Sequence, residues 1–415
     1  PSYNVLASVG HVRDLPKSRL GIDIENQFEP GYINIRGKGD KIKELKKAAA
    51  SASRVLLATD PDREGEAISW HLAYLLDIDP KSECRIVFNE INKEAVKEAI
   101  KHPRSIDMGL VDAQQARRVL DRLVGYQISP LLWQKVRRGL SAGRVQSAAL
   151  KMICDRENEI KSFVPEEYWT ITADYGDNFN ASLSKYNGED IRITKAEEAD
   201  TIEKQLSAGR FVVESVKTGK RKPKPYAPFT TSSLQQDASI KLNFQTKKTM
   251  QIAQQLYEGI DVKGIGTRGL ITYLRTDSVR ISSAAKEAAS EFIANKFGKE
   301  YCSNNSFSNK NKDIQDAHEA IRPTDINLEP EAIRDSLTSD QFKLYTLVWN
   351  RFVASQMSAA EFDTVTVTID NNGYEFRTSG SRLVFDGWRR VYPIANDKDS
   401  YVPELKKGDE LNCIE

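Results

Sequence analysis

The chain has 415 residues, of which 40% are hydrophobic and 29% charged, and its formal net charge is +1. A chain of this length is too long to fold around one ordinary hydrophobic core, so roughly two to four domains or lobes are expected. No run of about 18 apolar residues occurs, so no membrane-spanning helix is predicted. Strongly basic character, which is typical of nucleic-acid binders, is absent overall. Four cysteines without a C-x-x-C pair argue against a zinc module and a disulfide framework, and indicate a reducing cytoplasm.

Two strand–helix units are predicted near the start of the chain. Residues 54–76, RVLLATDPDREGEAISWHLAYLL, pass from an apolar run through an acidic turn into helical spacing. Residues 84–103 repeat this order, with a strand at 86–88 and a helix that begins near Asn92. Repeated units of this kind predict a parallel sheet, with sites at the carboxyl ends of its strands.

A helical and basic stretch follows over 108–163. Between Ala113 and Arg144 one acid, Asp121, accompanies seven basic residues: Arg117, Arg118, Arg122, Lys135, Arg137, Arg138 and Arg144. Solvated helices normally alternate acids with bases, so this excess favours phosphate contact. The small residues of GLSAGRVQS, 139–147, would let backbone N–H groups approach a phosphate at a helix start. The alternative is a flexible loop with a surface helix.

The rest of the chain changes between strand and helix patterns. Strand-like alternation begins near 164, with a hairpin around 186–190, and returns over 360–393 with an Asn-Asn-Gly turn. Helices are predicted between these β segments, over 230–259, 282–297 and 339–357. The economical explanation is a helical domain inserted into a β domain. The basic, proline-containing segment 217–224 is typical of a linker, either a solvated strap or a nucleic-acid contact.

The acidic turn carries the first candidate site. Asp60, Asp62 and Glu64 follow a predicted strand, and carboxylates at this spacing can hold Mg²⁺ with waters completing the octahedron. The alternative is that Asp62 caps the following helix, while Glu64 and Glu66 complement its dipole.

The stretch ITYLRTDSVRIS, 271–282, carries the second. Tyr273 is followed by Arg275 and a polar cluster, whereas most tyrosines only bury a ring. Together with an acidic turn and a basic stretch, this Tyr-x-Arg points to phosphodiester chemistry, in which a hydroxyl attacks phosphorus and cations stabilise the developing charge.

Five motifs in order resemble those of one family: LLATDPDREGEAISWHL, AQQARRVLDRLVGYQISPLLW, GLSAGRVQSAAL, ITYLRTDS and DAHEAIRPTD. They are similar to the motifs of bacterial type IA DNA topoisomerases, specifically of the topoisomerase I branch. The resemblance implies that Tyr273 attacks one DNA strand and forms a 5′-phosphotyrosyl enzyme. Another strand then passes, and the free 3′-hydroxyl reverses the link without ATP, so that negatively supercoiled DNA is relaxed.

The resemblance also implies roles for single residues. Arg275 would stabilise charge on the scissile phosphate, His318 and Arg85 would lie near it, and Asp60, Asp62 and Glu64 would hold Mg²⁺. The residues implied to contact a single DNA strand are His11, Arg117, Arg118, Arg122, Lys135, Ser141, Ala142, Gly143, Arg144, Val145 and Gln146. A cytoplasmic, nucleoid-associated monomer with no membrane partner is expected.

The implied fold is multidomain, with α/β, α and β parts arranged as the torus of type IA enzymes, here incomplete. Its expected segments are a Rossmann-like Toprim domain over 1–107 and the first part of a helical groove domain over 108–163. The first part of a β arch is expected over 164–224, an inserted helical tyrosine domain over 225–357, and the second part of the arch over 358–415.

Two departures from the family pattern accompany this resemblance. Family members carry a V-E-S-P-x-K strand before the point where this chain begins, and a further groove segment after the point where it stops. A truncated piece is therefore expected, with impaired cleavage and rejoining unless something completes it. The alternatives are another Toprim phosphodiester enzyme, a fragment that only binds single-stranded DNA, or a decatenating relative.

Overall fold

The computed structural model describes residues 3–89, 91, 93–176, 179–308, 319–394 and 400–415. The chain separates into two compact units, which are described one at a time. The first is Pro1–Phe163 together with Tyr257–Gly259, and the second is Val164–Leu256 together with Ile260–Glu415. The finer five-part division expected from the sequence stays a prediction.

The first unit is built around helices α1 (Gly39–Ser51) and α2 (Arg63–Leu76). Its hydrophobic core consists of Val12, Ile42, Leu57, Leu72, Ala73, Cys84, Ile106 and Val111. Helix α2 begins where the sequence predicts, because Asp62 accepts a hydrogen bond from the Gly65 N–H and two glutamates occupy the first turn. It ends at Asp77, which adopts a left-handed conformation. Helix α3 (Lys93–Lys101) confirms the second predicted helix.

The predicted parallel strands are shorter in the structure than the sequence suggests. Leu57 and Arg85 form an isolated parallel bridge, in which the Leu57 N–H donates to Cys84 and the Ile86 N–H donates to Leu57. The parallel pairing is therefore confirmed, but extended strands at 54–59 and 86–88 are wrong for the described residues. Two-residue antiparallel pairs complete this unit: β1 (Arg13–Asp14) with β4 (Ile33–Asn34), and β2 (Ile22–Asp23) with β3 (Glu29–Pro30).

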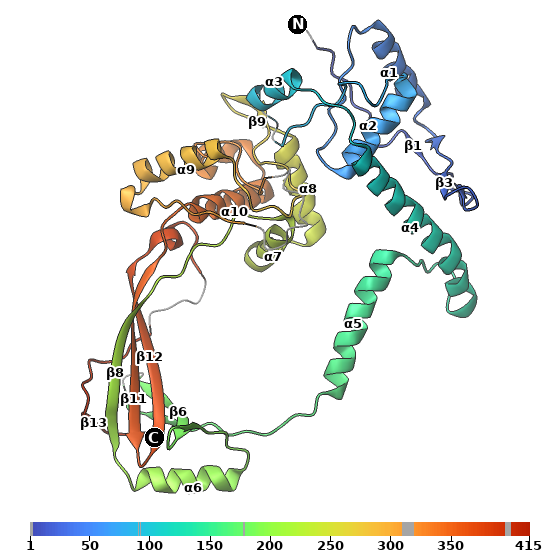
Figure 1. The fold of residues 1–415 in the computed structure, drawn as a ribbon. Coiled ribbons are helices and arrows are strands. Elements are labelled where there is room, and N and C mark those ends of the chain that lie inside the picture. The colour runs from blue at the N-terminus through green and yellow to red at the C-terminus, as the bar shows by residue number, and fades with distance from the viewer. Residues whose placement is uncertain (1–2, 90, 92, 177–178, 309–318, 395–399) are drawn as a thin grey trace. The chain divides into compact units, whose positions relative to one another are not determined.

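Two long helices end the first unit, as the basic stretch predicts. Helix α4 (Met108–Lys135) starts at Asp107, whose side chain accepts from the Leu110 N–H, and it packs against α2. Helix α5 (Arg144–Ser162) follows after a short connection (Figure 1). No residue of α5 is buried in the part of the chain that the structure describes.

The second unit contains a seven-stranded antiparallel sheet in the order β13-β8-β11-β12-β6-β5, with β7 paired to β6. Its long strands β8 (Phe211–Arg221), β11 (Glu361–Asn371) and β12 (Tyr374–Phe385) lie side by side (Figure 1). The predicted hairpin turns are confirmed at Asn187-Gly188 and Asn372-Gly373, where all four residues have positive φ. The shorter strands are β5 (Thr172–Asp174), β6 (Asn180–Tyr186), β7 (Glu189–Asp190) and β13 (Glu410–Leu411).

Most of the expected linker is a strand. Residues 217–221 belong to β8 and pair with β11, with Lys217 opposite Thr366 and Arg221 opposite Phe362. The basic side chains suggested a solvated strap, but they occupy exposed positions of a strand that pairs with β11 along this length. Only the residues after Arg221, where the prolines lie, leave the sheet.

The predicted helical insertion is confirmed, because β8 and β11 are direct neighbours although about 140 residues separate them in the chain. The inserted segment contains α7 (Thr231–Leu242), α8 (Thr246–Glu258), α9 (Ser283–Lys296) and α10 (Ser339–Ser355). Asn243 adopts a left-handed conformation and divides the first predicted helix into α7 and α8. The inserted segment also contains the short pair β9 (Ile260–Val262) and β10 (Gly266–Arg268). Helix α6 (Ala196–Ser207) lies outside this segment.

Short 3-10 turns occur at Lys299–Tyr301, Pro330–Ser336 and Gly387–Arg390. Among the described residues, none of the helices combines the length and the apolar character needed to cross a bilayer. All four cysteines are free.

Candidate functional site

The acidic loop of the first unit is fixed by close backbone packing against α2. A Cβ added to Gly65 would lie 2.1 Å from the Asp60 carbonyl oxygen, so only glycine allows the loop to pass this close to the helix. Asp62 Oδ1 accepts from the Gly65 N–H at 2.8 Å. The capping role weighed as an alternative for Asp62 is therefore present in the structure.

Glu64 faces α4 and His11. Its Oε2 atom lies 3.5 Å from His11 Nε2 and accepts from Gln114 Nε2 at 3.1 Å. The hydrogen bond from His11 lowers the pKa of the Glu64 carboxyl, with Gln114 adding to the effect and partial burial opposing it. Glu64 is therefore connected to α4 by the hydrogen bond from Gln114.

These residues line a cleft of about 320 Å³ within the first unit. It brings together four residues that the sequence singled out, with six others: His11, Glu64, Arg117 and Arg118, and Arg13, Asp14, Tyr32, His71, Gln114 and Asp121. Three arginines, Arg13, Arg117 and Arg118, line this cleft together with three acids, Asp14, Glu64 and Asp121.

The three carboxylates expected to share one Mg²⁺ do not converge. No group of three or more His, Cys, Asp or Glu side chains arranged to hold a metal ion occurs among the described residues. The physical reason is that Asp62 caps α2, whereas Glu64 lies within the helix and is engaged by His11 and Gln114. The donor chemistry of Asp60 and Asp62 still fits Mg²⁺, because this ion commonly takes one or two carboxylates together with waters and substrate phosphates.

Arg85 is directed into the interior of the first unit. Its side chain is fully buried, and Nε donates to Glu66 at 2.9 Å. The two terminal nitrogens donate to backbone carbonyls of the acidic loop and its neighbours, at Leu57, Thr59, Asp60 and Ile86. The guanidinium offers no exposed face to a phosphate, and the expected place of Arg85 near the reacting phosphate stays a prediction. Arg85 positions the loop that carries Asp60.

Glu66 completes this buried cluster, whereas the sequence suggested only that it complements the dipole of the helix. Its carboxylate also accepts from Arg104 Nη1 at 2.8 Å and from the Asp107 N–H at 2.7 Å, immediately before α4. Burial raises the pKa of Glu66, but the hydrogen bonds from Arg104, Asp107 and Arg85 outweigh it, so the pKa lies below its usual value.

The basic stretch is partly neutralised by Asp14, which is distant in sequence, and by Asp121 of the stretch itself. Arg118 makes a two-pronged ion pair with Asp14, at 2.8 and 2.7 Å from Nη2 to the two carboxylate oxygens. Arg144 Nε donates to Asp121 at 2.7 Å, which joins the start of α5 to α4. Arg122 donates to the Tyr126 hydroxyl and stacks over its ring. Lys135 is exposed at the end of α4.

The segment 141–146 opens α5. Gly143 precedes the helix without a side-chain cap, and Gln146 Nε2 donates to Ser141 at 3.3 Å. The Ala142 N–H donates to Ser129, while Val145 is exposed. The first turn therefore presents backbone N–H groups that lack a side-chain cap, as phosphate contact requires.

The second candidate site lies in the second unit. Tyr273 is buried, whereas Arg275, two residues later, is exposed. The Thr272 N–H donates to the Arg322 carbonyl at 2.9 Å, and the Thr272 hydroxyl donates to Ala320 at 2.7 Å. The tyrosine stretch thus lies beside the AIRP segment, as the order of motifs implies.

His318 lies outside the described residues. Its neighbour Glu319 accepts from Arg322 Nε at 2.8 Å, and Arg322 is buried. The structure therefore places the chain that follows His318 against the tyrosine stretch, without describing the histidine.

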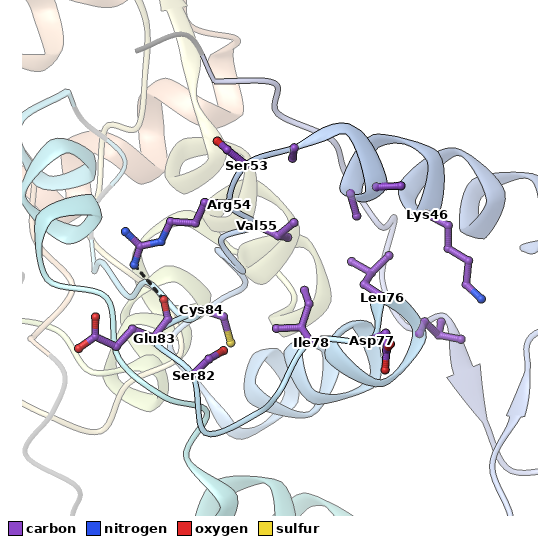
Figure 2. A pocket seen from close by; sticks show the side chains of 14 residues that line it. Lys46, Ser53, Arg54, Val55, Leu76, Asp77, Ile78, Ser82, Glu83 and Cys84 are labelled. Atoms are coloured by element: carbon purple, nitrogen blue, oxygen red, sulfur yellow. Dashed lines mark hydrogen bonds between the residues drawn. The ribbon is translucent and has the colours of Figure 1, made fainter.

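A larger cavity of about 750 Å³ lies elsewhere in the first unit and contains none of the expected site residues. It is formed by the ends of α1 and α2 and by residues 82–84, with Lys46, Leu76 and Cys84 on its wall (Figure 2). Arg54 donates to the Glu83 carbonyl at 3.0 Å across one side. Nothing in its lining suggests phosphodiester chemistry.

His71, in the wall of the smaller cleft, leads to a pH prediction. Burial, followed by the charges of Arg13 and His11, lowers its pKa to about 3. The unfolded chain therefore binds a proton near pH 6.5 that the folded chain does not take up until about pH 3, so stability falls as the pH is lowered through this window. Between pH 7 and 5 the expected loss is about 2 kcal/mol.

The measurement is urea unfolding at pH 7 and pH 5 for the protein and its His71→Gln variant. The variant should lose less stability between the two values, whereas His102→Gln, at an exposed histidine, should behave like the parent. An identical pH dependence in His71→Gln would contradict the assignment.

Comparisons with known proteins identify the family of the chain. Residues 2–91 match the family model of the Toprim domain, and residues 105–415 match the model described as DNA topoisomerase. The structure is similar to that of full-length topoisomerase I from Thermotoga maritima in a monoclinic crystal form, with a TM-score of 0.87 and 42% sequence identity. The match covers 99% of this chain and 67% of that chain.

These matches confirm the predicted fold class and indicate an isomerase whose substrate is DNA. The chain belongs to the bacterial type IA DNA topoisomerases, in the topoisomerase I branch.

Proposed function

We propose that the protein relaxes negatively supercoiled DNA by transient cleavage of one strand through Tyr273. The observation that carries this proposal is the Tyr273–Arg275 pair, which a network of hydrogen bonds from Thr272 and its neighbours holds in place. A hydroxyl nucleophile and an exposed guanidinium two residues apart are the groups that attack on phosphorus needs.

In the proposed reaction the Tyr273 hydroxyl oxygen attacks the scissile phosphorus. The bond between phosphorus and the 3′ oxygen breaks, the phenolic proton is given up, and the leaving oxygen takes a proton to become a 3′-hydroxyl. Arg275 stabilises the negative charge that develops on the phosphate, as a planar guanidinium does well. After another strand has passed, the 3′-hydroxyl attacks the phosphotyrosine and restores the backbone. ATP is not needed, because the covalent link conserves the energy of the phosphodiester bond.

Mg²⁺ is proposed to bind at Asp60 and Asp62 and would supply positive charge that holds DNA phosphates for rejoining. Arg85 pairs with Glu66 and donates a hydrogen bond to the Asp60 carbonyl. The backbone of this loop is therefore held without the metal. Glu64 is proposed to act through its hydrogen bonds with His11 and Gln114, or to turn toward the ion when DNA is bound.

A single DNA strand is proposed to lie along α4 and the start of α5. His11, Arg117, Arg118, Arg122 and Lys135 would contact phosphates, with 141–146 contributing backbone N–H groups. His318 is retained as a group near the reacting phosphate. We further propose that the protein acts as a monomer on cytoplasmic, nucleoid-associated DNA.

The test uses a single-stranded oligonucleotide labelled at its 3′ end, with a second labelled at its 5′ end. It is run on this chain and on a chimera that adds the part of the T. maritima chain lying outside the match. After denaturation, 3′ label should remain on the protein and 5′ label should not, and Tyr273→Phe should retain neither. Retention of 5′ label, or retention of 3′ label by Tyr273→Phe, would overturn the assignment.

A binding-only protein is the other outcome. It would be established if neither the chain nor the chimera formed a covalent product while both still bound the oligonucleotide with salt-dependent affinity.

A further inference from the structure

The loop that follows Tyr273 is held by the first residue of α7. The Thr231 hydroxyl donates to the Leu274 carbonyl at 2.7 Å and accepts from the Thr276 N–H at 2.8 Å. The Thr231 N–H in turn donates to the Thr276 carbonyl at 2.8 Å. One threonine therefore holds the backbone on both sides of Arg275.

These contacts use groups that a helix start leaves available. The first N–H groups of a helix have no partner within the helix, and Thr276 supplies one for Thr231. The cap itself is made by the preceding residue, since Thr230 and Ser233 form a capping box. The Thr231 hydroxyl is thus not needed to cap the start of α7, and it forms hydrogen bonds with the loop instead.

The same short segment also reaches the chain that follows His318. The Phe229 carbonyl accepts from the Ile321 N–H at 2.8 Å, and the two residues form an antiparallel bridge. We call residues 229–231 the brace. The brace connects the Tyr273–Arg275 loop with the AIRP segment, and all of these contacts lie within the second unit.

We infer that Thr231 is a positioning residue for the cleavage reaction, which it serves by fixing the backbone that carries Arg275. Thr276 is buried and Arg275 is exposed, so the guanidinium is presented from a loop whose ends cannot move independently. Without the hydroxyl, the Leu274 carbonyl and the Thr276 N–H lose their partner and the loop shifts. A displacement of about 1 Å at a reacting group can slow a reaction by roughly 100-fold.

This inference rests on the proposed function, and its test separates the two. The rate of covalent complex formation is measured in single turnover with saturating 3′-labelled oligonucleotide, and the Kd for the oligonucleotide is measured separately. The protein is the form that cleaves in the parent assay, either the chain or the chimera. If neither forms a covalent product, the proposed function fails and not merely the role of Thr231.

Thr231→Val removes the hydroxyl with little change of shape, and Thr231→Ser retains it. The matched control is Thr346→Val on α10, because the Thr346 hydroxyl donates to a carbonyl of its own helix at 2.7 Å and does not contact the loop. Thr231→Val should slow covalent complex formation by about 10- to 100-fold with an unchanged Kd. Thr231→Ser should recover the parent rate to within about threefold, and Thr346→Val should match the parent.

Hydrogen exchange supplies a structural readout, since the Thr276 amide should exchange faster in Thr231→Val while the amides of α10 keep their protection. If Thr231→Val does not fold, Thr231→Ala removes the same hydroxyl and takes its place. The inference is overturned if Thr231→Val slows the reaction no more than Thr346→Val, if Thr231→Ser is as slow as Thr231→Val, or if the slower rate is matched by an equal rise in Kd.

Discussion

Replacement of Arg85 by methionine is expected to destabilise the protein by about 3 to 5 kcal/mol, because it removes one partner of a fully buried ion pair. Four backbone carbonyls lose their donor at the same time. Glu66 keeps Arg104 and the Asp107 N–H, so the carboxylate does not become completely unpaired. The free energy of unfolding from urea titrations measures the effect.

The control is Arg54→Met, which removes an exposed arginine that donates to the Glu83 carbonyl. This change should stay within about 0.5 kcal/mol of the parent. If Arg85→Met were as mild as Arg54→Met, the buried cluster would not hold the acidic loop, and a direct role of Arg85 at the phosphate would have to be reconsidered.

The second large effect concerns DNA affinity. Neutralising three proposed phosphate contacts, in the triple variant Arg117→Gln, Arg122→Gln and Lys135→Gln, should reduce the slope of log K against log salt by about 2, since each contact to a single strand contributes about 0.7. If the two proteins bind equally at 1 M salt, this change in slope corresponds to a loss of affinity of roughly several hundredfold at 50 mM salt. Fluorescence anisotropy of a labelled oligonucleotide over a salt series gives both quantities.

A control variant of equal charge change neutralises three exposed lysines of the second unit, Lys195, Lys204 and Lys407. It should leave the slope unchanged. Equal losses in the two triple variants would mean that net charge, rather than a defined path along α4, determines the affinity.

The helices and hairpins could be predicted because their signals are local. Asp62 and Thr338 cap the helices that follow them, and the Asn-Gly turns require the positive φ that these residues accept. The strand at 217–221 was mistaken for a linker because its charges suggested solvent, whereas its pairing with β11 depends on a partner more than 140 residues away. Long-range pairing of this kind leaves no local signal.

The candidate site residues also divide into those with a local sequence signal and those that depend on long-range contacts. Tyr273, Arg275 and the acidic turn could be proposed as site residues because each lies in a compact motif. The inward direction of Arg85 was missed because an arginine is rarely fully buried, and only Glu66 and the loop carbonyls make it possible here. The ion pair between Asp14 and Arg118 spans 104 positions and could not be read from the composition of either segment. Thr231 was missed because a threonine at a helix start usually indicates a cap alone.

The central claim is that Tyr273 becomes covalently linked to a 5′-phosphate of DNA, and peptide mapping of the trapped complex tests it most directly. After denaturation and nuclease treatment, trypsin should release the peptide Gly269–Arg275, GLITYLR, with a nucleotide attached to Tyr273 through its 5′-phosphate. A nucleotide on any other residue, or one attached through a 3′-phosphate, would contradict the account.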